Sequence, residues 1–173
     1  MNYKEEITLA MAMLARHPKT LFVGQSVIYG GQAMFPTIVD VPKDKRFELP
    51  VAEEFQMGFC TGLALAGFIP ICMFPRCVFV LLDANQLVNH LDKIPVMGDF
   101  RPQVIIRTAV GPMEPLNAGP QHTQDHTEAF KLMLKTIPVI ELLKAEEVFD
   151  AYEAALERQG STVIVEHMRL YRG

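Results

Sequence analysis

The feature that most constrains the fold is the alternation of two kinds of segment along the 173 residues. Short apolar or β-branched runs typical of strands are TLFVG, IPICMF, QVIIRTAV, VIELL and STVIVE. Helical periodicity fits the segments between them, at residues 3–15, 53–66, 78–92, 125–134 and 145–158. This order predicts right-handed crossovers and one doubly wound α/β domain over residues 1–173. We expect a mostly parallel sheet of about five or six strands with helices on both faces.

Two stretches fit neither pattern, residues 25–48 with several Gly and Pro, and the polar residues 110–124. Both follow a predicted strand. In open α/β sheets, ligands bind outside the carboxyl ends of the strands. We therefore expect these two loops to carry the functional site.

Composition and charge exclude several classes of partner. Half of the residues are hydrophobic, and the net charge is −4 with Lys and Arg scattered along the chain, so we expect neither nucleic acid nor a membrane surface as a partner. The N-terminus carries acids where a secretory signal would be basic, and a cytoplasmic location is expected. The three cysteines, Cys60, Cys72 and Cys77, make an odd number in apolar surroundings and are expected to be reduced core residues.

Two adjacent acids, Glu53 and Glu54, stand at the head of the small and apolar segment ELPVAEEFQMGFCTGLALAG. Pro50 predicts a helix start that places both in the first turn, where the helix dipole favours acids. Small residues at four-residue spacing, Gly58 and Gly62, predict close packing against another backbone. The apolar neighbours of Glu53 would desolvate its carboxylate unless a ligand or hydrogen-bond donor meets it.

These residues resemble the pyrimidine-binding domain of thiamine-diphosphate enzymes of the transketolase and 2-oxo acid dehydrogenase type. The resemblance lies in PVAEEFQMGFCTGLALAGFIPICMF, in VFVLLDANQLVNHLDKI, in GPQHTQ at residues 119–124 and in VEHMRLY at residues 165–171. The last two are similar to segments of the dehydrogenase β subunits. The four segments follow the family's order at compatible spacing across nearly the whole chain.

The resemblance implies a role for Glu53, which lies three residues after Pro50 and five before Gly58. In this family such a glutamate hydrogen-bonds the N1′ atom of the aminopyrimidine and so promotes loss of the thiazolium C2 proton. For Glu54 we expect no such role, and we interpret it as an acid that is solvated or interacts with the helix dipole. Gln25 falls among the cofactor-binding positions but is neutral where the family often has an acid, which puts a proton path through it in doubt.

Two further residues receive roles from the resemblance. Phe79 falls where the family stacks an aromatic ring on the pyrimidine, although an ordinary core phenylalanine fits its position as well. His122 within GPQHTQ would lie near the reacting centre, where imidazole can exchange protons. A loop histidine without such a role is the alternative.

The resemblance also implies thiamine diphosphate, with Mg²⁺ held mainly by another chain. The family's metal motif, Gly-Asp-Gly with a later Asn, has no counterpart here, since MGDF at residues 97–100 lacks the second glycine. We expect no metal ligands in this chain. The expected partners are a diphosphate-binding subunit that carries this motif and a second copy of this chain.

The expected reaction is decarboxylation of a 2-oxo acid with acyl or aldehyde transfer. Ketol transfer from a ketose, as in transketolase, is an alternative, and so is a non-catalytic regulatory subunit that keeps the fold. Departures from the family pattern, such as Met73 in place of an acid, leave room for the latter. The chain can be a split subunit or part of a longer product.

Other site types fit the residues less well. His122 and His126 have the i, i+4 spacing of zinc ligands, but the Glu of His-Glu-x-x-His is missing. GQSVIYGG lacks the Gly-x-Ser-x-Gly elbow of hydrolases. Neither GGQAMF nor GLALAG supplies the Gly-x-Gly-x-x-Gly of dinucleotide-binding folds.

Overall fold

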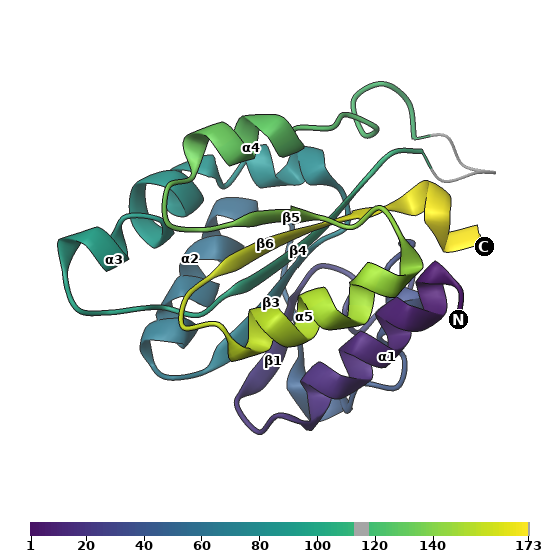
Figure 1. Ribbon diagram of the computed structural model, residues 1–173, viewed down its shortest axis with the longest axis horizontal. Coiled ribbons are helices and arrows are strands. Elements are labelled where there is room, and N and C mark those ends of the chain that lie inside the picture. The colour runs from purple at the N-terminus through teal and green to yellow at the C-terminus, as the bar shows by residue number, and fades with distance from the viewer. Residues whose placement is uncertain (113–117, 173) are drawn as a thin grey trace.

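The computed structural model describes residues 1–112 and 118–172, and within them the chain forms one six-stranded sheet. The strand order is β2-β1-β3-β4-β6-β5, and every pairing is parallel (Figure 1). The strands are β1 Thr20–Gly24, β2 Arg46–Glu48, β3 Ile69–Phe74, β4 Ile105–Val110, β5 Val139–Glu141 and β6 Thr162–His167. The predicted α/β fold with a parallel sheet is confirmed.

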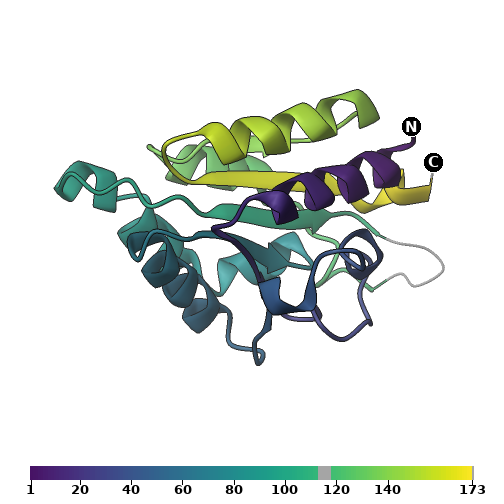
Figure 2. The ribbon, with the colours of Figure 1, turned by 90° about the horizontal axis from the view of Figure 1, so that it is seen from below.

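Helices cover both faces of this sheet. The α-helices are α1 Tyr3–Arg16, α2 Glu53–Leu65, α3 Ile94–Met97, α4 Thr127–Met133 and α5 Val148–Glu157. The 3-10 segments are η1 Phe35–Thr37, η2 Lys43–Lys45, η3 Cys77–Leu81, η5 Ala145–Glu147 and η6 Met168–Arg172, and η4 Asn85–Leu91 is a π-helix. Helices α1 and α5 lie side by side on one face, with α2 on the other (Figure 2). None of the described helices is long and apolar enough to cross a membrane.

The observed elements differ from the predicted ones at β2, at residues 78–92 and at α3, a four-residue helix that was not predicted. Strand β2 lies inside residues 25–48, where no strand was predicted, because Arg-Phe-Glu is short and has no β-branched residue. The helix predicted over residues 78–92 divides into η3 and η4, which are separated by a turn at Leu82 and Asp83. The other unassigned stretch, residues 110–124, includes 113–117, which lie outside the described residues.

The central strands are apolar on both faces because each face packs against helices. Ile71, Ile105 and Ile164 belong to the core beneath α1 and α5. Their neighbours along the strands, Cys72 and Ile106 among them, belong to the core beneath α2, η4 and α4. This alternation follows from the two-residue period of a strand.

A buried ion pair joins the neighbouring strands β4 and β6. Arg107 Nε donates to Glu166 Oε1 at 2.8 Å, and both side chains are fully buried. Arg107 Nη2 donates to Thr37 Oγ1 at 2.9 Å, and the hydroxyls of Tyr152 and Tyr171 donate to the Glu166 carboxylate. Although burial disfavours its charge, the adjacent Glu166 raises the pKa of Arg107 above its ordinary value. The pair thereby ties the loop after β1, helix α5 and the C-terminal turn to the sheet.

Replacement of Arg107 by Met should lower the free energy of unfolding by about 3–5 kcal/mol, because it leaves the Glu166 carboxylate buried and unpaired. The double variant Arg107→Met/Glu166→Gln should recover part of this loss. Urea denaturation followed by circular dichroism measures both.

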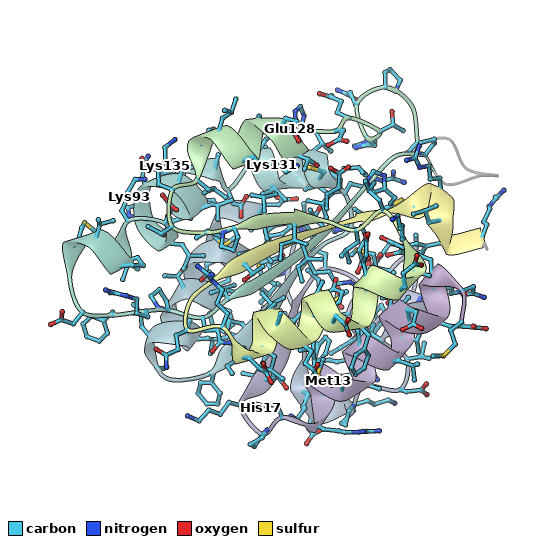
Figure 3. The ribbon with its side chains drawn as sticks, viewed as in Figure 1. Met13, His17, Lys93, Glu128, Lys131 and Lys135 are labelled. Atoms are coloured by element: carbon cyan, nitrogen blue, oxygen red, sulfur yellow. The ribbon has the colours of Figure 1, made fainter. Side chains whose placement is uncertain are left out.

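Lys131→Ala is the control, because Lys131 forms surface ion pairs, with Glu128 Oε1 at 2.7 Å and Glu141 Oε2 at 3.7 Å from its Nζ (Figure 3). We expect that change to cost less than about 1 kcal/mol. An Arg107→Met variant as stable as this control would contradict the assigned role of the pair.

Candidate functional site

Helix α2 begins at Glu53, as the sequence predicts. Its N-cap residue, Ala52, makes no side-chain cap hydrogen bond, so the first N–H groups of α2 lack a side-chain cap, and the helix dipole favours the acids of the first turn. The two acids differ in environment: Glu53 is only 7% exposed, whereas Glu54 is exposed and accepts from the amides of Asn85 and Gln86. The structure therefore separates a buried acid from a solvated one.

The N-terminal end of α2 is fixed against the carboxyl ends of β1 and β3. Gln56, one turn after Glu53, donates from Nε2 to the Met73 carbonyl at 2.9 Å. Gly24 allows this approach, since its φ of +154° favours glycine and a Cβ there would lie 2.5 Å from the Met73 oxygen. The next residue, Gln25, donates from Nε2 to Glu53 Oε1 at 3.3 Å. Gln25 and Glu53, two of the predicted site residues, are therefore in contact.

The loop after β1 is held by the carboxylate of Glu48 at the end of β2. Three successive backbone N–H groups donate to it, from Ser26 at 2.6 Å and from Val27 and Ile28 at 2.8 Å each. Ser26 has a φ of +56°, which a non-glycine residue rarely adopts. Glu48 therefore sets the shape of the loop that begins with Gln25.

The other two predicted residues, Phe79 and His122, also lie together. Their ring centroids are 5.5 Å apart with an interplanar angle of 56°. Arg76 Nη1 donates to the His122 carbonyl at 3.1 Å and so joins the loop after β3 to the loop after β4. His122 Nδ1 is buried and has no hydrogen-bond partner within residues 1–112 and 118–172. The hydrogen-bonding capacity of that nitrogen is therefore unused by the described residues.

Two cavities adjoin Phe79 at the carboxyl edge of the sheet. One, of about 460 Å³, lies between the loop after β1, including Gln32 and Phe35, and the loop after β3, including Arg76. The second, of about 240 Å³, is lined by Leu82 and His122. Since β2 and β3 lie on opposite sides of β1, the first cavity is at a topological switch point, where α/β folds bind ligands.

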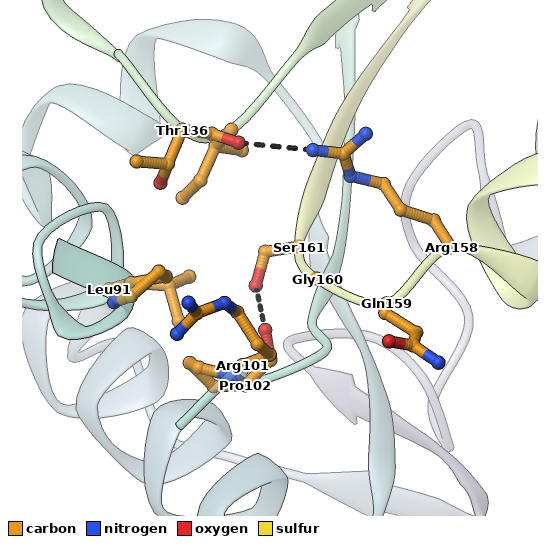
Figure 4. A pocket seen from close by; sticks show the side chains of 10 residues that line it. Leu91, Arg101, Pro102, Thr136, Arg158, Gln159, Gly160 and Ser161 are labelled. Carbon is orange, nitrogen blue, oxygen red and sulfur yellow. Dashed lines mark hydrogen bonds between the residues drawn. The ribbon is translucent and has the colours of Figure 1, made fainter. Parts of the chain in front are cut away.

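A further cavity of about 310 Å³ lies at the opposite edge, where β4 and β6 begin. Figure 4 shows Ser161 Oγ donating to the Pro102 carbonyl at 2.8 Å and Arg158 donating to the Thr136 carbonyl at 3.2 Å. None of the four predicted site residues lines this cavity. The amino edge is therefore not the candidate site.

The structure thus joins the predicted residues in two pairs, Gln25 with Glu53 and Phe79 with His122. The sequence analysis missed Gln56, although its polar side chain one turn after Glu53 was a usable signal. It also missed Glu48, because β2 was not recognised. The described residues contain no group of three or more His, Cys, Asp or Glu that could hold a metal ion, so the spacing of His122 and His126 finds no third ligand there.

Comparison with known proteins identifies the relatives of this chain. Residues 1–173 match the family described as "Transketolase, pyrimidine binding domain". The chain is 26% identical over 129 residues to the pyruvate dehydrogenase E1 component subunit beta of Cyanidium caldarium, covering 72% of this chain and 38% of that protein. It is 22% identical over 181 residues to the 2-oxoisovalerate dehydrogenase subunit beta of Bacillus subtilis, covering 99% and 54%. It thus spans about half or less of these relatives.

Solved structures share the fold. A protein described as "Split gene transketolase, inactive beta4 tetramer" superposes with a TM-score of 0.74 at 18% identity, covering 97% of this chain and 52% of that one. The transketolase of Campylobacter jejuni gives a TM-score of 0.72 at 11% identity, covering 95% and 25%. At these identities the likeness shows the fold alone.

Replacement of Glu48 by Gln should loosen the loop after β1, because a neutral amide loses the charge-assisted hydrogen bonds. We expect the amides of Ser26, Val27 and Ile28 to exchange about tenfold faster or more. Hydrogen exchange followed by NMR measures this, with the exposed Glu128→Gln as control. Unchanged protection at the three amides would show that Glu48 does not hold the loop.

Proposed function

Because the chain belongs to the transketolase pyrimidine-binding domain family, we propose that it is the pyrimidine-binding subunit of a split thiamine-diphosphate-dependent enzyme that acts on a 2-oxo acid. The observation that supports this most directly is the burial of the Glu53 carboxylate at the start of α2. The adjacent Glu54 is exposed to solvent and so does not share this environment. The similarity to dehydrogenase β subunits supports 2-oxo acids as the substrate class.

The residues at the carboxyl edge fit the aminopyrimidine half of the cofactor. When bound, thiamine diphosphate supplies a carbon nucleophile that also stabilises a carbanion after bond cleavage. Glu53 would hold a proton at the N1′ ring nitrogen, and Gln25 orients the Glu53 carboxylate through its hydrogen bond. Phe79, half-buried beside two cavities, would pack against the flat ring. His122 would use its unpaired Nδ1 to move or hold a proton on the substrate.

The diphosphate and Mg²⁺ would be held by a separate chain. This proposal is supported by the sequence, which has no Gly-Asp-Gly motif with a later Asn, and by the lack of a metal-binding cluster in the described residues. The partner would complete the site from its own side. A second copy of this chain would complete the assembly.

The outer surface of α2 is suited to such an assembly. Val51, just before the helix, is 78% exposed, and Phe55 in its first turn is 55% exposed. Gly62 on the same helix is exposed, and a Cβ there would meet nothing within 4 Å. The small-residue face predicted from Gly58 and Gly62 is thus open at Gly62, and we propose that another helix packs there.

Ketol transfer remains the alternative reaction, since transketolases share the fold. A non-catalytic subunit is the alternative if the protein is not an enzyme. It is supported by Gln25, which is neutral where the family often has an acid. Turnover of a 2-oxo acid, of a ketose or of neither by the assembled protein distinguishes the three.

Replacement of Glu53 by Gln in the assembled enzyme should lower turnover about 10²–10⁴-fold, because the amide cannot supply the proton. Assembly with the partner, measured by size-exclusion chromatography, should be unchanged. Glu54→Gln is the matched control and should keep near-normal turnover. Near-normal turnover in Glu53→Gln would rule out the proposed role.

Replacement of His122 by Ala should slow the acyl- or carbonyl-handling step about 10²-fold or more. The Kd for thiamine diphosphate, measured by calorimetry, should change much less, because His122 would act on the substrate. His90→Ala, at an exposed histidine, is the control. Equal losses in both measurements would argue against a role in substrate chemistry.

A further inference from the structure

One buried acid lies beside the proposed site without any role in it. Asp83 occupies the turn between η3 and η4, and its side chain is 0% exposed. Neither of its carboxyl oxygens has a hydrogen-bond partner in the described residues. Burial of a charged carboxylate without a partner is strongly unfavourable. A carboxyl group in this position needs either a cation or a proton.

Among the described residues, the charged groups that act on Asp83 are acids. These are Glu53 and Glu54 of α2, and both disfavour a further negative charge. From β3 it faces Cys72, a thiol whose pKa is raised by burial, then by Cys60, and also by Asp83 itself. The backbone N–H of Asp83 itself favours the charged form, although it does not reach hydrogen-bond geometry with either carboxyl oxygen.

The polar group on the neighbouring helix is an acceptor. Gln56 uses its Nε2 for the Met73 carbonyl, and its Oε1 is buried without a partner in the described part of the chain. The side-chain amides that follow Asp83 in the chain, those of Asn85 and Gln86, donate to Glu54. Protonated Asp83 has an O–H group that can donate to acceptors such as Gln56 Oε1. Ionised Asp83 is a carboxylate near other carboxylates, which repel it.

We propose that Asp83, fully buried and with no hydrogen-bond partner for either carboxyl oxygen in the described residues, is held as a neutral carboxylic acid and acts as a positioning residue for Glu53. Burial, and then the charges of Glu53 and Glu54, raise the pKa of Asp83 to about 8. Its ionisation at higher pH places a buried negative charge near Glu53. The Glu53 carboxylate is then repelled from the position in which Gln25 holds it.

The link to catalysis rests on the proposed function, but the protonation of Asp83 does not. Protonation of Asp83 in the folded chain makes the stability of the fold depend on pH. The folded chain keeps this proton up to about pH 8, whereas the unfolded chain releases it near pH 3.8. Stability from this group is therefore fully present below about pH 4 and is lost as the pH rises toward 8. Asp83→Asn, which keeps the shape without a titrating proton, should remove this decline.

The direct test is ¹³C NMR of the full chain with labelled Asp carboxyl carbons. One resonance should titrate near pH 8 and should be missing in Asp83→Asn. A wild-type chain in which every Asp carboxyl titrates below about pH 5 would overturn the proposal.

Coupling to Glu53 is tested in chains that keep Asp83, so it does not depend on the folding of Asp83→Asn. Glu53→Gln removes one repelling charge and should lower the Asp83 midpoint by about half a pH unit or more. Glu128→Gln on the surface should leave it unchanged. An Asp83 midpoint unaffected by Glu53→Gln would overturn the positioning role. A midpoint near 8 together with normal turnover of the assembled Glu53→Gln enzyme would instead reject the proposed function and leave the neutral Asp83 in place.

Discussion

The contact on which the site depends is the close approach of helix α2 to the ends of β1 and β3. Gln56 reaches the Met73 carbonyl only because Gly24 has no side chain at the point where a Cβ would collide with that oxygen. Glu53 lies one turn earlier on the same helix and is therefore buried at the carboxyl edge of the sheet. The parallel direction of all strands then brings the loops carrying Gln25 and Phe79 to this edge.

The chain treats its buried acids in two different ways. Glu166 is neutralised by Arg107 and by two tyrosine hydroxyls, and this network stabilises the packing of distant segments on the sheet. Glu53 and Asp83 have no comparable cation in the described structure. Asp83 is surrounded by a thiol and by other acids, and burial and those acids raise its pKa. The ion-paired acid therefore stabilises the fold, whereas the acid with the raised pKa lies beside the proposed site.

Much of the fold could be predicted from sequence because β3, β4 and β6 are buried along their whole length and rich in apolar or β-branched residues, despite Arg107 in β4 and Glu166 in β6. Strand β2 could not, because an edge strand of three residues is held by its neighbour rather than by its own composition. The prediction of one helix over residues 78–92 was wrong at its centre, because a turn at Asp83 separates η3 from η4 although the apolar pattern continues through it. Glu53 could be predicted from its spacing to Pro50 and Gly58, whereas the burial of Asp83 depends on how η3 and η4 pack against α2 and required the structure.

The central claim is that this chain provides the pyrimidine half of a site completed by another chain. Native purification of the chain from its own cells, with mass spectrometry of what accompanies it, tests this most directly. The account predicts a stoichiometric partner that carries Gly-Asp-Gly and a downstream Asn, in a complex that retains thiamine diphosphate and Mg²⁺. Recovery of the chain alone or only with itself, in a form that does not retain the cofactor, would contradict the claim.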